Sequence, residues 1–206
     1  MRRLVGVIVA MGVAAAAFAQ DAPPVRPVRD VVVEYRPIGM GENGGGAITM
    51  HFANKGGRIR IDSPDGGFVA FDSATDRTLI VIAPNRSYMD VATDPAQRPP
   101  FFAPHGGLVK SGTATVAGAR CSIYDARING QDGQLCLTDD GVLLRVESGG
   151  RRMEAVRVSF DAQPASLFEP PAGFRKTEPP RPRRGMTDDG PPNPPRGSYW
   201  GIQTGR

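Results

Sequence analysis

Apolar residues recur at every second position in many short runs between residues 30 and 160. In the first run, Val31, Val33 and Tyr35 occupy alternate positions. Successive side chains of a β-strand point to opposite faces of the sheet, so this pattern indicates strands with one face toward a core. It predicts about ten strands, in the runs 31–36, 47–53, 58–62, 68–72, 78–83, 87–91, 121–128, 134–138, 142–148 and 153–160.

Segments rich in Gly, Asn, Asp and Pro separate these runs, among them 54–57, 63–67 and 139–141. Such residues favour tight turns, so the spacing predicts the hairpins and meanders of an antiparallel sheet. One segment departs from the strand pattern, because Pro164 is placed to open a short helical turn that ends before Pro170. The predicted fold class is therefore all-β, an antiparallel sheet with at most one short helix.

The first 19 residues have the three-part pattern of a secretory signal peptide. Two arginines precede an apolar run, 4–18, that ends in Ala17-Phe18-Ala19. A run of about 15 residues is short for a membrane span, which needs about 20; an uncleaved anchor or a buried helix is the alternative. We therefore expect cleavage near Ala19, a periplasmic location, and a mature chain without a transmembrane segment.

The basic residues concentrate in the C-terminal tail, 175–206. The tail holds seven of the 25 basic and three of the 21 acidic residues. Without the tail and the signal sequence, the body retains 16 basic and 18 acidic residues, so it lacks the net positive charge of a nucleic-acid-binding domain. The Pro- and Arg-rich tail has too few apolar residues to fold, which predicts disorder. It is either a solubilising appendage or a contact for an anionic envelope surface.

The chain has two cysteines, Cys121 and Cys136. An even number of cysteines in an exported protein predicts a disulfide, because disulfides persist in oxidising compartments; two free buried thiols are the alternative. A two-residue turn at 129–130 would place Cys121 opposite Thr138, so direct pairing of the cysteines needs a longer loop or a bulge.

The position of Cys136 indicates on which side of the sheet the bridge lies. Leu135 and Leu137 share a face, so the side chain of Cys136 between them points the other way. We therefore expect the bridge to lie outside the main core.

Four stretches, 58–91, 111–128, 133–148 and 159–176, occur in an order that resembles the exported bacterial family known as domain of unknown function 4412. That family is similar in layout to the LolA/LolB-like superfamily of lipoprotein localisation factors. The resemblance covers about residues 30–176. It implies a strongly curved antiparallel sheet, an unclosed half-barrel around an apolar cavity, in proteins that carry lipoproteins or sense lipid-linked signals.

Taken together with the predicted export, the resemblance favours a periplasmic binding protein whose concave face holds an apolar or lipid-like ligand, such as a lipid or a lipidated protein; we expect it to be non-enzymatic, for the reason given below. The alternative is a structural or interaction module of the cell envelope with no small ligand, which docks a protein partner or an anionic surface. The candidate lining of the cavity consists of Met50, Phe52, Phe68, Tyr88, Phe101 and Phe102.

Phe101 and Phe102 lie in the segment 93–112, which shows neither a strand nor a helix pattern. Irregular segments of this length in compact domains are usually functional or disordered. One hypothesis is that this loop covers the open side of the sheet, with the two rings filling or gating the cavity. The alternative is that the rings fill the end of the sheet as part of the core.

No catalytic or metal-binding pattern stands out. The sequence contains no Gly-x-Ser-x-Gly, His-Glu-x-x-His or phosphate-loop motif. The two histidines, His51 and His105, form no ligand motif with the cysteines, and His51 is predicted on the polar, solvated face of its strand. We therefore expect no enzymatic activity, no metal and no cofactor. The predicted organisation is a signal peptide, a linker, a β domain and a disordered tail: 1–19, 20–29, 30–174 and 175–206.

Overall fold

The computed structural model describes residues 23–38, 46–53, 55, 57–93, 107–128 and 130–179. Strands dominate this part of the chain, with two short 3-10 turns. The strands are β1 (Val31–Ile38), β2 (Ile48–Ala53), β3 (Arg58–Asp62), β4 (Phe68–Asp72), β5 (Arg77–Ile82), β6 (Ser87–Ala92), β7 (Val109–Val116), β8 (Ala119–Ile128), β9 (Gln131–Leu137), β10 (Leu143–Ser148), β11 (Arg151–Ser159) and β12 (Arg175–Lys176), and the 3-10 turns are η1 (Ala83–Asn85) and η4 (Ala165–Phe168).

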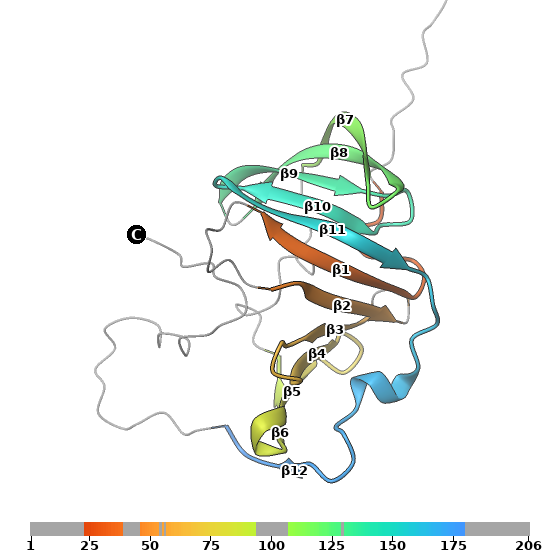
Figure 1. Cartoon of the computed structure of the whole chain (residues 1–206). Helices are drawn as coiled ribbons and strands as arrows, with labels where there is room; N and C mark the ends of the chain where they lie inside the picture. Colours follow the sequence, from red (N-terminus) through yellow and green to blue (C-terminus); the bar gives the residue numbers. More distant parts are fainter. Residues whose placement is uncertain are drawn as a thin grey trace, which may run out of the picture.

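All these strands form one sheet with the order β12-β6-β5-β4-β3-β2-β1-β11-β10-β9-β8-β7. Neighbours pair antiparallel, except that β12 pairs with β6 in parallel. The two end strands, β12 and β7, are not paired with each other, so the sheet is open. The strand direction changes steadily from β7 to β6 (Figure 1), and at one end the sheet curls until β7 approaches β11. The predicted all-β, curved antiparallel sheet is therefore confirmed.

The sheet consists of two meanders joined side by side. The first, β1–β6, and the second, β7–β11, each pair strands that follow one another in the chain. The two meet where β1 pairs with β11, with a bulge between Glu34 and Tyr35; we call this pairing the seam. The connection from β6 to β7 joins strands far apart in the sheet, and most of it, 94–106, lies outside the described residues.

The main hydrophobic core spans the seam. Val31, Val33 and Tyr35 have no solvent exposure, which confirms the alternation predicted for this strand. The Tyr35 hydroxyl donates a hydrogen bond to the carbonyl of Leu143 at 2.7 Å, so burial leaves no unpaired polar atom there. Burial also raises the pKa of the Tyr35 hydroxyl far above its ordinary value.

The predicted disulfide joins Cys121 to Cys136, with 5.4 Å between their Cα atoms. Ile128 pairs with Gln131, as a two-residue turn requires, so neither a longer loop nor a bulge is needed between β8 and β9. Cys136 pairs with Ile123 instead, and the bridge reaches diagonally to the next residue on the same face, two positions along β8.

The bridge lies inside the main core, so the expectation that it lies outside is wrong. Cys121 is 2% exposed and Cys136 1% exposed, and both belong to the main hydrophobic cluster. The register does turn Cys136 away from the face of Leu135 and Leu137. The error was to assume that one face of this strand is solvated, whereas its last three residues are all buried.

Other parts of the chain depart from the sequence-based expectations. The irregular segment 93–112 overlaps strand β7, which begins at Val109. The segment expected to be a linker packs on the turn after β9, where the backbone N–H of Val28 donates to the carbonyl of Asp140 at 3.0 Å. The sheet also continues past the predicted boundary at residue 174 into β12. The turn at Pro164 forms as expected, as η4.

The predicted signal peptide, 1–19, lies outside the described residues, as do Phe101, Phe102 and the tail beyond residue 179. Within the part that is described, no helix is long and apolar enough to cross a membrane.

Candidate functional site

One face of the first meander is built from two rows of side chains that cross all six of its strands. Residues paired directly across antiparallel strands point to the same side, so the register defines each row. The first row is Val33, Met50, Ile61, Val69, Ile80 and Met89. The second row is Val31, Phe52, Ile59, Phe71, Thr78 and Val91. We call this surface the apolar face.

The apolar face changes character from β1 to β6. Val33 and Met50 are fully buried and Ile61 is 4% exposed, all within the main core. Farther along the rows, Val69, Ile80, Met89 and Val91 are half-buried, and none of them belongs to either hydrophobic cluster of the described residues. We call these four residues the apolar wing. The rows therefore include apolar side chains, those of the apolar wing, that are not part of the hydrophobic core of the described residues.

The structure separates the side chains predicted to line one cavity. Met50 and Phe52 lie on the apolar face, within the main core. Phe68 pairs with Asp62, and Tyr88 pairs with Val81; all four lie on the opposite face of the sheet. A cavity lined jointly by Met50, Phe52, Phe68 and Tyr88 is therefore excluded, because the sheet itself lies between the two pairs.

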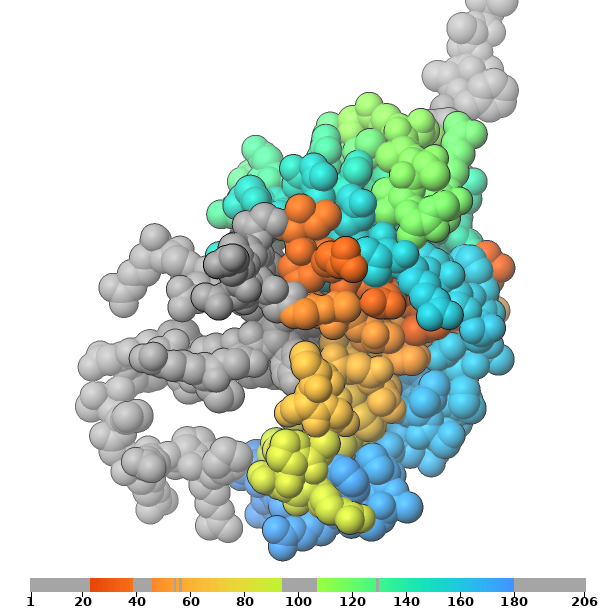
Figure 2. Space-filling view, viewed as in Figure 1, coloured from red at the N-terminus to blue at the C-terminus, as the bar shows by residue number. Residues whose placement is uncertain are grey.

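The opposite face of the first meander is covered by the chain's own C-terminal segment, 161–177, which we call the strap. It leaves β11, passes through η4 and ends as β12 beside β6 (Figure 1). The space-filling view shows it lying against the margin of the first meander (Figure 2). This face is therefore not solvated as the polar residues on it suggested.

An apolar cluster anchors the strap near β12. Phe168 and Phe174 pack against Phe68, Ala70 and Val81. At the end of the strap, the backbone N–H of Arg175 donates to the carbonyl of Arg86 at 3.1 Å, and that of Thr177 donates to the carbonyl of Tyr88 at 2.8 Å. Side-chain packing and main-chain hydrogen bonds thus both attach this end of the strap to the sheet.

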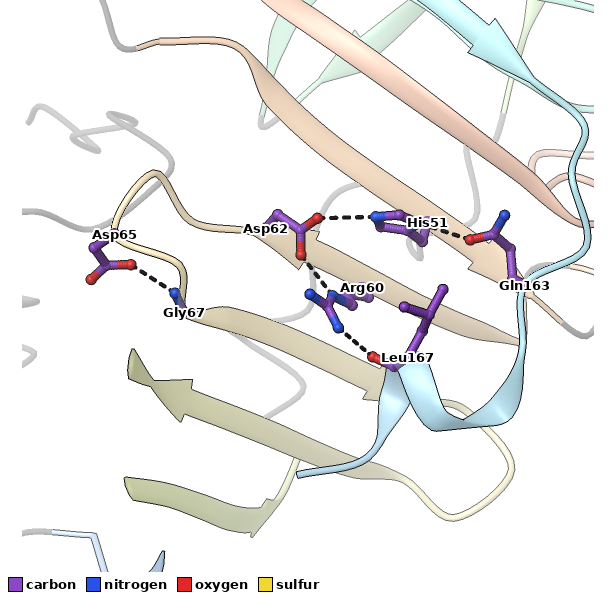
Figure 3. Close-up of polar contacts among 7 residues, drawn as sticks. All are labelled: His51, Arg60, Asp62, Asp65, Gly67, Gln163 and Leu167. Atoms are coloured by element: carbon purple, nitrogen blue, oxygen red, sulfur yellow. Dashed lines mark hydrogen bonds and ion pairs between the residues drawn. The ribbon is translucent and has the colours of Figure 1, made fainter. Parts of the chain in front are cut away.

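A polar network anchors the strap near η4 (Figure 3). The His51 ring lies between the Asp62 carboxylate, with Nε2 at 3.0 Å, and the Gln163 side-chain oxygen, with Nδ1 at 2.7 Å. Arg60 donates to Asp62 at 2.6 Å and to the carbonyl of Leu167 at 2.6 Å. The His51 side chain is 16% exposed. The prediction of a solvated surface histidine is therefore wrong, because the strap covers it.

The electrostatics of this network favour an ionised Asp62. Burial alone would raise the pKa of the Asp62 carboxyl, but hydrogen bonds from His51 and Arg60, together with their positive charge, outweigh burial and lower that pKa below its ordinary value. A lowered pKa contributes stability that is present above the ordinary pKa and is lost as the pH falls through the lowered one.

Replacing Asp62 by Asn is therefore expected to destabilise the protein by about 1–2 kcal/mol at neutral pH. The difference from the wild type should shrink as the pH falls below about 4, from the ordinary pKa of an aspartate through the lowered pKa of Asp62, because the wild type then loses the same charge. Urea unfolding at a series of pH values measures this. Asp132→Asn, at a carboxylate with 97% side-chain exposure, is the control. A difference that stays constant with pH would contradict the assignment.

The network has no nucleophile among the hydrogen-bond partners of His51 described above, and no group of three or more His, Cys, Asp or Glu side chains in the described residues is arranged to hold a metal ion. Its groups join the sheet to the strap. Local sequence pattern gives no signal for this contact, since His51 and Gln163 are 112 positions apart.

A comparison with protein-family models finds no match, and neither does one with curated proteins. Among solved structures, the chain is similar to an uncharacterized conserved protein from Thermus thermophilus, with a TM-score of 0.51 and 9% identity over 74% of this chain and 91% of that one. Membership of family 4412 stays a prediction, whereas the open, curved sheet agrees with the layout that the LolA/LolB-like resemblance implies.

Two further structures are similar at lower scores. PNGF-II matches with a TM-score of 0.47 and 13% identity, over 73% of this chain and 31% of that one. The MucA/MucB complex of Pseudomonas aeruginosa matches with a TM-score of 0.45 and 18% identity, over 68% of this chain and 55% of that one. The chain thus spans about a third and just over half of these two chains. These two likenesses, with TM-scores below 0.5, support no conclusion about this protein. The likeness to the Thermus protein shows the fold alone.

Proposed function

We propose that the protein is an exported, non-enzymatic binding module that holds an apolar, lipid-like ligand against the apolar wing. The observation that carries this proposal is the continuation of both apolar rows onto β4–β6, where Val69, Ile80, Met89 and Val91 are half-buried and outside the clusters of the described core. Contiguous apolar surface beyond the needs of a core is typical of binding sites.

The chemistry of the rows favours an acyl chain over a polar ligand. The two rows contain one polar residue, Thr78, and no charged residue. Its hydroxyl already contacts that of Thr93 at 2.9 Å. A ligand on this surface would gain stability from the removal of apolar area from water, which needs no hydrogen-bonding group.

The proposed export has separate support. A buried disulfide joins both cysteines of the chain, and disulfides persist in oxidising compartments such as the periplasm. Cleavage of a signal peptide near Ala19 remains part of the proposal. Mass spectrometry of the protein recovered from cells would show whether the mature chain begins near Gln20.

Met89→Arg is expected to weaken binding of a dansyl-labelled undecanoic acid to the full mature chain by at least about tenfold, equivalent to about 1.4 kcal/mol. The charge would need to be desolvated beside the acyl chain. The measurement is a fluorescence titration at constant protein concentration. The matched control is Thr75→Arg, in the exposed turn between β4 and β5, which should bind like the wild type.

The titration, combined with native mass spectrometry, distinguishes a lipid-binding protein from an interaction module. Saturable binding by the wild type, together with lipid in the native mass spectrum of protein purified from its own envelope, supports the proposal. No saturable binding and a lipid-free mass with a stoichiometric protein partner would overturn it in favour of the interaction module.

A further inference from the structure

Both ring nitrogens of His51 face hydrogen-bond acceptors. One faces the carboxylate of Asp62 and the other the side-chain oxygen of Gln163. The orientation of the Gln163 amide is fixed, because its nitrogen donates to the carbonyl of Asp161 at 2.7 Å. A neutral imidazole donates from one nitrogen and accepts at the other. Both contacts are therefore hydrogen bonds only when the ring carries two protons and a positive charge.

These two hydrogen bonds join the sheet to the strap at the entry to η4. The backbone N–H of Gln163 also donates to the Asp30 carboxylate at 2.9 Å, and Arg60 donates to the carbonyl of Leu167 within η4. The strap is thus hydrogen-bonded to the rest of the protein both before its 3-10 turn and within it. Among these residues, His51 joins the sheet to the strap through a ring whose charge depends on pH.

We propose that His51 is a charge-dependent latch that fastens the strap to the sheet when the ring is protonated and loosens it when the ring is neutral. Loss of one proton turns a donor into a lone pair that faces an acceptor, so one of the two contacts becomes repulsive. Loosening at η4 leaves the strap held only by its other anchor, the apolar cluster at Phe68, Ala70 and Val81 and the pairing of β12 with β6, so opening of the whole strap becomes easier. The latch does not depend on a ligand at the apolar wing.

The charged groups around His51 determine the sign of the pH dependence. They are Arg60 and Asp62 on β3, Asp30 before β1, Asp161 in the strap, and Glu34, which lies two residues along β1 from the position that pairs with His51. Carboxylates and guanidinium groups keep their charge between about pH 5.5 and about pH 8.5, whereas histidine changes its charge there. The fastening is therefore present at the acidic end of this range, where a histidine ring is protonated, and is lost at its basic end, where the ring is neutral.

Hydrogen–deuterium exchange of the full chain tests the latch. The quantity compared is the protection of the amides of Gln163, Arg175 and Thr177, corrected for intrinsic exchange and divided by the protection of the β9 amides. In the wild type we expect this ratio to fall by about tenfold between about pH 5.5 and about pH 8.5, the size of one charge-assisted hydrogen bond. In His51→Gln, which cannot change its charge, the ratio should be nearly independent of pH.

A second variant and a histidine control keep the test decisive if His51→Gln perturbs the sheet. Gln163→Leu leaves β2 and β3 unchanged and removes the acceptor in the strap, so its ratio should also be low and nearly independent of pH. His105→Gln, at the other histidine of the chain, should retain the wild-type pH dependence. The proposal is overturned if the wild-type ratio is the same at both pH values, if its change persists in Gln163→Leu, or if it disappears in His105→Gln.

Discussion

Replacing Cys121 and Cys136 together by alanine is expected to lower the free energy of unfolding by about 3 kcal/mol. The bridge closes a loop with a sequence separation of 15 residues, and the loss of that constraint increases the entropy of the unfolded chain by about this amount. Both sulfurs are also buried in the main core, so packing adds to the loss. The melting temperature should fall by roughly 6–12 °C.

Urea unfolding of the oxidised wild type, the reduced wild type and the double variant checks this prediction. The reduced wild type retains the sulfur atoms in the core and should lie between the other two. If the double variant is as stable as the oxidised wild type, the bridge does not constrain the unfolded chain in the way described here.

Met50→Ala is expected to lower the free energy of unfolding by about 3 kcal/mol, within the range for a fully buried Met, Leu or Ile. Met50 has no solvent exposure and lies in the main core. Met89→Ala, in the same cross-strand row, should lower it by less than about 1 kcal/mol, because the side chain is half-buried. The two variants remove the same atoms from the buried part and from the half-buried end of one row.

Thermal and urea unfolding of both variants, combined with the acyl-chain titration, separate the core from the proposed binding surface. Met50→Ala should affect stability and leave the affinity of the remaining folded protein nearly unchanged. Met89→Ala should do the reverse. Equal losses of stability in the two variants would show that the core extends to β6 and would argue against the apolar wing as a binding surface.

Alternation alone was sufficient to predict most of the strands. In β3 the apolar residues fall on a single parity, with Ile59 and Ile61 between Arg58, Arg60 and Asp62, and the structure buries both. One solvated or polar face leaves a clear period of two in the sequence. The turn residues then indicated where each strand ends.

Alternation could not assign the faces of β4 and β5. Phe68 and Ala70 have one parity, Val69 and Phe71 the other, and both sets are apolar. Strands covered on both faces give continuous apolar runs, and here the strap covers the second face. Only the pairing of Asp62 with Phe68 across the turn 63–67 places Phe68 with the polar residues of β3, which is why the candidate lining mixed two faces.

Strand β7 was not predicted for the opposite reason, because too few of its residues are apolar to show an alternating pattern. Its residues Lys110, Ser111 and Gly112 are polar or small and mostly exposed, as is common in edge strands, which avoid apolar side chains. Ala117 and Gly118 connect Val116 to Ala119 as a two-residue hairpin. Both have positive φ values, 48° and 77°, but only the glycine is a turn residue that the sequence could show.

The seam between β1 and β11 has a consequence for the kinetics of folding. Every other antiparallel pairing joins strands that follow one another in the chain, so each meander can assemble from short-range contacts. Pairing β1 with β11 must instead close the longest loop in the sheet, and contacts of high sequence separation form slowly. The disulfide joins two strands of the second meander, within the chain that this closure spans, and shortens the loop only by its own sequence separation of 15 residues. Because the entropy of loop closure changes slowly with loop length, we expect the bridge to stabilise the protein with little effect on the closure that limits the folding rate.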